Sequence, residues 1–160
     1  MNFLDIEINE KLFIKILSVM IVLVVVYLAF TMSSLLVFKS YTLGANTTVN
    51  EEESVINTHI DLLEHNDKKI EISGWAYKEG EPIGKVNCNY VLKNRETGKM
   101  YLMRTQMEEN INIQEDEYKM AGLHAQCLLF GIPKGVYDIY VLYKNNLEDI
   151  LSFTLISVEL

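Results

Sequence analysis

The sequence has few of the residues that most often carry chemistry. It contains only two cysteines among 160 residues, and neither lies near the amino terminus, which excludes a lipid-modified cysteine as the anchor. The three histidines have no ligand-pair spacing with either cysteine, so no metal site is expected. No Ser-His-Asp, Cys-His or paired-carboxylate arrangement is discernible. The sequence therefore predicts a protein that is not an enzyme and needs no cofactor.

Basic residues are also scarce. The chain holds 14 Lys and Arg against 22 Asp and Glu, which gives a formal net charge of −8. Residues 1–39 carry three lysines and three acidic residues, so the whole net charge belongs to the rest of the chain. An acidic domain is a poor partner for nucleic acid or for anionic lipid head groups, because both are bound through their phosphates. Nucleic-acid binding is excluded.

Charge is absent altogether from Ile16 to Phe38. A helix over residues 16–38 would be about 35 Å long, which is enough to cross the ~30 Å hydrocarbon core of a bilayer. A segment this apolar on every side has no polar face to turn toward water. The sequence predicts a transmembrane helix over 16–38, preceded by a short cytoplasmic head at 1–15.

Lysines near the span give its expected orientation. Lys11 and Lys15 flank one end and Lys39 flanks the other, which favours a cytoplasmic amino terminus and an extracellular carboxyl-terminal domain. The alternative is a cleaved signal peptide. Its apolar region would be much longer than the usual 7–15 residues, and the best cleavage site, at residues 43–45, begins with a leucine. We therefore expect an uncleaved, single-pass anchor in the cell membrane.

Beyond the span the composition and periodicity of the sequence change twice. Residues 39–54 are polar and show no periodicity, which is typical of an exposed linker. Residues 55–160 contain short alternating runs separated by turn residues, the pattern of an all-β sandwich or barrel. The runs that we predict to be strands are 57–63, 69–77, 85–93, 100–107, 121–130, 136–143 and 149–160.

Three motifs carry a resemblance to a known module. They are Ile70–Tyr77 (IEISGWAY), Tyr118–Ala125 (YKMAGLHA) and Lys134–Tyr140 (KGVYDIY). Together they resemble an immunoglobulin-like β-sandwich module of surface and glycopolymer-assembly proteins in low-GC Gram-positive bacteria, with Leu123 where that module has an aromatic residue. The resemblance implies an antiparallel immunoglobulin-like β-sandwich and a cell-surface setting. It implies no catalytic residues.

The last predicted strand is apolar on both faces. Leu151, Phe153 and Leu155 follow one another on the face opposite Ile150 and Val158. One interpretation is a central strand covered on both sides. The other is a docking surface for a partner, formed by the first three residues, because exposed apolar patches mark interaction sites.

Three aromatic residues are candidates for binding a sugar. Strand alternation directs Trp75, Tyr77 and Tyr140 away from the core, where their rings could stack on a glycan. A bulge at Gly74 would instead turn Trp75 inward as a core residue, and this is the alternative that we favour.

The cysteines leave two alternatives. Cys88 and Cys127 lie in the middle of predicted strands, where they could form a disulfide or remain two buried free thiols.

These features support two functional hypotheses. The first is a non-catalytic accessory or scaffolding subunit of a cell-surface assembly complex, concerned with cell-wall or capsular polysaccharide. Its partner would be a polytopic membrane enzyme or transporter. The second is a tethered carbohydrate-binding module at the cell surface, with a polysaccharide as its ligand.

Overall fold

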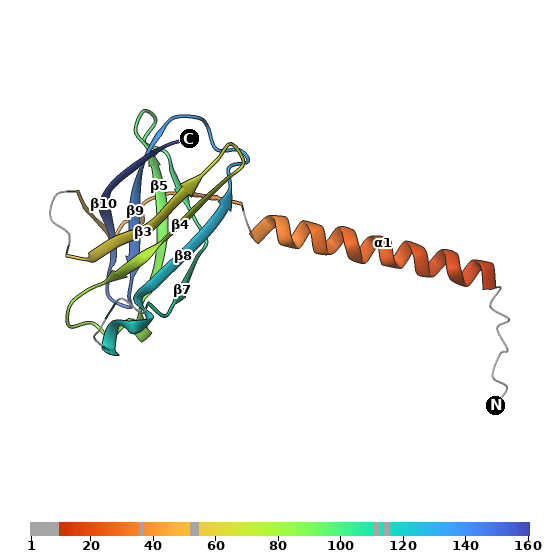
Figure 1. Cartoon of the computed structure of the whole chain (residues 1–160), viewed down its shortest axis with the longest axis horizontal. Coiled ribbons are helices and arrows are strands. Elements are labelled where there is room, and N and C mark those ends of the chain that lie inside the picture. The colour runs from red at the N-terminus through yellow and green to blue at the C-terminus, as the bar shows by residue number, and fades with distance from the viewer. Residues whose placement is uncertain (1–9, 36, 52–54, 111–112, 114–115) are drawn as a thin grey trace. The chain divides into compact units, whose positions relative to one another are not determined.

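The computed structural model describes residues 10–35, 37–51, 55–110, 113 and 116–160. They form two units, a helix that ends at Leu35 and a β domain from residue 36 to the carboxyl terminus (Figure 1). Each unit is described separately.

Helix α1 spans Glu10–Leu35 and contains an apolar span from Phe13 to Thr31 with a mean hydropathy of 2.7. Helices of this length and composition near an amino terminus occur both as membrane spans and as signal sequences. The predicted boundaries differ at both ends. The helix begins at Glu10, within the predicted cytoplasmic head, whose residues 1–9 lie outside the described part. It ends at Leu35 rather than at Phe38.

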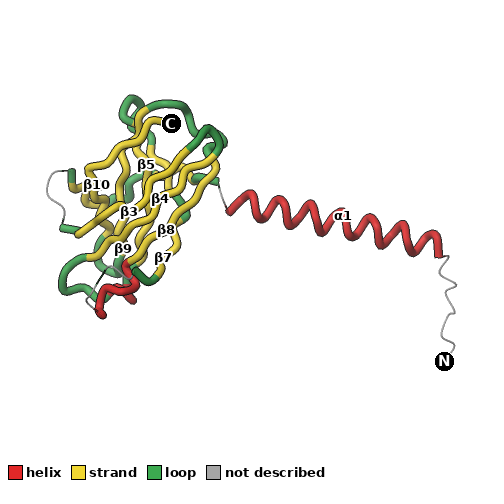
Figure 2. The backbone as a smooth tube through the Cα atoms, viewed as in Figure 1, coloured by secondary structure: helices red, strands yellow, loops and turns green. Residues whose placement is uncertain are grey.

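The described residues of the β domain form ten strands in two sheets (Figure 2). One sheet has six strands in the order β1-β6-β5-β9-β10-β2, and the other has four in the order β3-β4-β8-β7. All pairs are antiparallel except β2 with β10. The elements are β1 (Lys39–Tyr41), β2 (Thr47–Asn50), β3 (Asn57–His65), β4 (Lys69–Tyr77), η1 (Ile83–Lys85), β5 (Asn87–Asn94), β6 (Met100–Leu102), β7 (Thr105–Glu108), η2 (Asp116–Ala121), β8 (Gly122–Leu128), β9 (Val136–Lys144) and β10 (Asp149–Glu159).

The main core lies between the sheets because each central strand turns its alternate apolar residues inward. Burial along β4 alternates without a break over nine residues, as the sequence predicts. The facing sheet contributes large side chains from β5 and β9, including the fully buried Tyr90 and Tyr137. Figure 1 shows β3, β4, β8 and β7 as one layer with β5, β9 and β10 behind it.

The predicted strand 100–107 is wrong as a single element. Met100–Leu102 belongs to the six-stranded sheet and Thr105–Glu108 to the four-stranded sheet. Between them Met103 is fully buried and its N–H donates to the carbonyl of Tyr90 at 2.9 Å. The hydroxyl of Thr105 accepts from the N–H of Tyr90 at 2.8 Å, so the crossing chain stays bonded to β5.

The predicted linker at residues 39–54 is also wrong, because its first part is built into the domain. The last two residues of the predicted span, 16–38, also belong to the domain: Val37 forms a parallel bridge with Leu128, and Phe38 is only 8% exposed and lies in the main core. β1 and β2 then occupy opposite edges of the six-stranded sheet. Five residues, 42–46, connect the two strands, and all five are exposed. Residues 52–54 lie outside the described part of the chain.

Gly74 is required by a close approach between β3 and β4. A Cβ atom at this position would lie 2.0 Å from the backbone oxygen of His59. The strand irregularity that the sequence suggests does exist, but it lies in β3, between Ile60 and Leu62. β4 itself stays regular, so the predicted inward turn of Trp75 into the main core is wrong. Trp75 is half-buried and packs against a second apolar cluster of Ile83, Ile113, Tyr118 and Ala121.

We predict that Gly74→Ala destabilises the domain by about 2 kcal/mol or more, because the added methyl group overlaps backbone rather than a movable side chain. Gly84→Ala is the matched control, since a Cβ at Gly84 meets no atom within 4 Å. Urea unfolding of both variants measures the difference. Equal stabilities would contradict the close approach of β3 and β4.

Candidate interaction surfaces

An aromatic row lies on the outer face of the four-stranded sheet. Successive ring centroids are separated by 5.7 Å from His59 to Trp75, 5.5 Å from Trp75 to Tyr77 and 4.3 Å from Tyr77 to Tyr118. The last two pairs are stacked, so the rings of this row cover much of one another's faces. Stacking on a sugar needs a free ring face. The row is therefore better suited to stabilise the sheet and η2 than to serve as a glycan platform.

Tyr140 does not belong to that row. It points away from the main core, as alternation predicts, but it lies on the six-stranded sheet and is only 3% exposed. The Phe153 ring packs against it at 5.2 Å, and the Lys93 ammonium lies 5.4 Å from its ring centroid. The prediction of an exposed Tyr140 is wrong because neighbouring side chains cover it. The three candidate glycan-binding aromatics thus lie on two different sheets, one of them buried.

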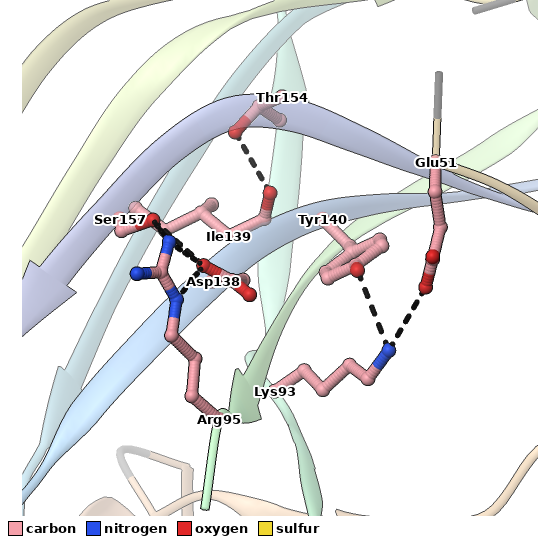
Figure 3. A network of polar contacts seen from close by, with 8 residues as sticks. All are labelled: Glu51, Lys93, Arg95, Asp138, Ile139, Tyr140, Thr154 and Ser157. Carbon is pink, nitrogen blue, oxygen red and sulfur yellow. Dashed lines mark hydrogen bonds and ion pairs between the residues drawn. The ribbon is translucent and has the colours of Figure 1, made fainter. Parts of the chain in front are cut away.

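Polar contacts bind β5, β9 and β10 together beside Tyr140 (Figure 3). Lys93 Nζ donates to Glu51 at 3.1 Å, while Arg95 and Ser157 both donate to Asp138 Oδ1 at 2.7 Å. Burial of Asp138 opposes its ionisation, but the hydrogen bonds from Arg95 and Ser157 outweigh burial, so the pKa of Asp138 lies below its usual value. The network stabilises the outer face of the six-stranded sheet.

The three apolar residues of β10 that were predicted to form a docking surface differ in how far they are buried. Leu151 is fully buried and Phe153 is half-buried, as expected for a strand with neighbours on both sides. Leu155 is 77% exposed and has a backbone φ of 63°, in the left-handed region that side chains other than glycine rarely adopt. It lies where the register between β9 and β10 shifts.

The kink at Leu155 is held by its neighbours. The Thr154 hydroxyl donates to the carbonyl of Ile139 at 2.8 Å, and pairing with β9 resumes at Ser157. Next to the kink, a hollow of about 240 Å³ is lined by Ile56, Thr58 and Phe153 among others. Of the predicted docking surface Leu151, Phe153 and Leu155, the structure leaves Leu155 as the exposed member. A strained residue that presents an apolar side chain is a candidate contact for a partner.

Sequence reasoning missed a polar trio on the outer face of the four-stranded sheet. Ser73 Oγ lies 2.9 Å from His124 Nδ1, and His124 Nε2 lies 4.0 Å from Glu71. The last distance is too long for a hydrogen bond. Glu71 instead accepts from Lys69 at 3.2 Å and from Gln126 at 3.0 Å, and the Lys69 ammonium lowers the pKa of its carboxyl. The trio therefore joins neighbouring strands and does not form the relay of a hydrolase.

The cysteines are both free and buried. Cys88 lies opposite Tyr143, near the β9–β10 turn, whereas Cys127 lies opposite Ile70, near the β3–β4 turn. These turns belong to opposite ends of the domain, so the disulfide alternative is wrong. Burial raises the pKa of Cys88 to about 12 and also raises that of Cys127. Both thiols are therefore protonated at neutral pH and unreactive.

Comparison of the chain with protein-family models, with curated proteins and with solved structures finds no match. Within the described residues there is also no group of three or more His, Cys, Asp or Glu side chains that could hold a metal ion. The expectation of a protein without catalytic activity or cofactor stays a prediction. The surfaces themselves must therefore indicate the function.

We predict that Asp138→Asn lowers stability at pH 7 by about 1 kcal/mol, since Arg95 is half exposed and the ion pair is partly screened. A carboxylate with a lowered pKa stabilises the fold above its unfolded value and loses this contribution as pH falls through its folded value. The difference from wild type should therefore shrink below about pH 4. Denaturant unfolding at several pH values measures it, and the exposed Glu96→Gln serves as control. A difference that persists at pH 2 would contradict this role of Asp138.

Proposed function

We propose that the chain is a non-catalytic accessory subunit of a cell-surface assembly complex. α1 anchors it in the cell membrane with the amino terminus in the cytoplasm, and the β domain lies outside. Its partner is a polytopic enzyme or transporter of cell-wall or capsular polysaccharide assembly. The polysaccharide setting rests on the resemblance carried by the 70–77, 118–125 and 134–140 motifs.

The observation that carries this proposal is the burial of Phe38 three residues after α1 ends. A tethered binding module needs a free stalk to reach a polymer away from the membrane. Here Phe38, which was expected at the end of the membrane span, belongs to the core, and the residues expected to form the stalk supply β1 and β2 to the sheet. A domain that begins at its anchor is suited to a partner within the same membrane.

The same residues support an uncleaved anchor. Cleavage at the candidate site at residues 43–45 would remove β1 and the buried Phe38 from the folded domain. Losing a buried phenylalanine side chain alone costs about 3–5 kcal/mol, a large part of the stability of a small domain. An intact chain is therefore required for the fold described above.

The strand order supports an immunoglobulin-like arrangement. Immunoglobulin sheets have the orders A-B-E-D and C-F-G, which correspond to β3-β4-β8-β7 and to β5-β9-β10. Near the start of β9, the Tyr137 hydroxyl donates to the carbonyl of Pro133 at 2.6 Å, as in the tyrosine corner of such domains. Such a fold licenses no activity by itself, but it offers exposed surfaces for recognition.

The carbohydrate-binding alternative has weaker support. It relied on Trp75, Tyr77 and Tyr140 as one exposed platform, whereas Tyr140 is buried on the other sheet. Leu155 is the better candidate for a specific contact, because it combines high exposure, backbone strain and an adjacent hollow.

We predict that Leu155→Gly separates binding from stability. Glycine adopts a φ of 63° without strain, so the variant should be as stable as wild type or more stable by up to about 1 kcal/mol. It should nevertheless lose the apolar contact and retain roughly tenfold less partner. The full-length chain is purified from its native membranes in mild detergent, and co-purifying proteins are quantified by mass spectrometry. Leu147→Gly, at another highly exposed leucine, is the matched control.

Stoichiometric recovery of one polytopic protein with wild type and Leu147→Gly, and its loss with Leu155→Gly, would support the accessory role. Recovery of the chain alone, together with retention of cell-wall polysaccharide by the full-length protein, would overturn it in favour of the binding module.

A further inference from the structure

The loop between β8 and β9 presents an apolar side chain on a rigid support. Phe130 is 84% exposed at the tip of a turn in which the Ile132 N–H donates to the carbonyl of Leu129 at 3.2 Å. The positive φ of Gly131, 80°, lets the chain reverse there. The Leu129 N–H also donates to the carbonyl of Lys68 at 2.8 Å. Phe130 therefore points into solvent although its neighbours are fixed.

The far side of the loop is fixed as well. The Tyr137 hydroxyl donates to the carbonyl of Pro133. Gly135 and Leu160 form two backbone hydrogen bonds with each other, both of 2.9 Å. Leu129, Ile132 and Leu160 line a hollow of about 230 Å³ at this end of the domain. A loop that is fixed on both sides loses little conformational entropy when its tip binds a surface.

Covalent continuity places this loop near the end of α1. Only Leu36 separates Leu35 from Val37, which is bridged to Leu128, two residues before Phe130. Whatever the orientation of the two units, the Phe130 backbone lies within about 20 Å of the helix end. The 26 residues of α1 extend over about 39 Å, more than the hydrocarbon core, so this end reaches the head-group region of a membrane that α1 spans.

We propose that Phe130 inserts into the interfacial region of the bilayer that α1 spans, and that the 129–135 loop is a second membrane contact of the domain. The proposal rests on the proposed function in one respect, the role of α1 as a membrane span. Phenylalanine side chains of membrane-surface segments bury at the boundary between head groups and acyl chains. Lys134 shares the lining of the hollow with Asp67 and Glu159, so no excess of basic charge surrounds it and the proposed contact is an apolar one.

Tryptophan quenching tests the insertion. The full-length Phe130→Trp variant is reconstituted into phosphatidylcholine vesicles that contain a lipid brominated near its head group. The native Trp75, the chain's single tryptophan, pairs with Gly122 at the other end of β8 and serves as an internal reference. Leu147→Trp, which is placed at a 93% exposed position in the β9–β10 turn, is the matched control.

We expect brominated lipid to reduce the emission added by Phe130→Trp roughly twofold, as for an interfacial ring. The wild type and Leu147→Trp should be quenched little. Vesicle flotation keeps the two proposals apart. A chain that does not float with the vesicles would contradict α1 as a span, and with it the insertion. A chain that floats while Phe130→Trp is quenched no more than Leu147→Trp would overturn the insertion alone.

Discussion

The organisation of this protein depends on the packing of Phe38 into the main core of the β domain. No charged residue separates the apolar span of α1 from Phe38, which belongs to the core between the two sheets. The next residues form one edge of the six-stranded sheet and, after a five-residue connection, the other edge. A helix joined to a folded domain in this way leaves no free stalk, so an anchor at α1 would also hold the domain at the membrane.

This constraint gives the surfaces of the domain different roles. The outer face of the six-stranded sheet carries an apolar cluster around Tyr140 and the polar network around Asp138 (Figure 3). The outer face of the four-stranded sheet carries rings that pack on one another. Among the exposed apolar residues of the described domain, Leu155 lies at a kink and Phe130 on a turn. The proposed contacts with a partner and with lipid both use such residues.

Alternation in the sequence predicted which way most strand side chains point, but not whether neighbouring side chains cover them. Trp75 and Tyr140 both point outward, as the period of two requires, yet Lys93 and Phe153 cover only Tyr140. These neighbours come from other strands, so local pattern carries no signal for them. Hydropathy likewise cannot distinguish Phe38 in a core from an apolar residue in a membrane span. The kink at Leu155 depends on pairing with β9, which the sequence of β10 alone does not encode.

Hydrogen exchange of the full-length protein in lipid nanodiscs tests the central claim most directly. If Val37 and Phe38 are built into the fold and β1 and β2 are sheet edges, the amides of residues 37–41 and 47–50 that bond within the domain should be protected well above those of an unstructured chain. Exchange of the whole 37–50 segment at the rate of a free peptide, with β4 and β9 still protected, would show a flexible stalk and contradict the account.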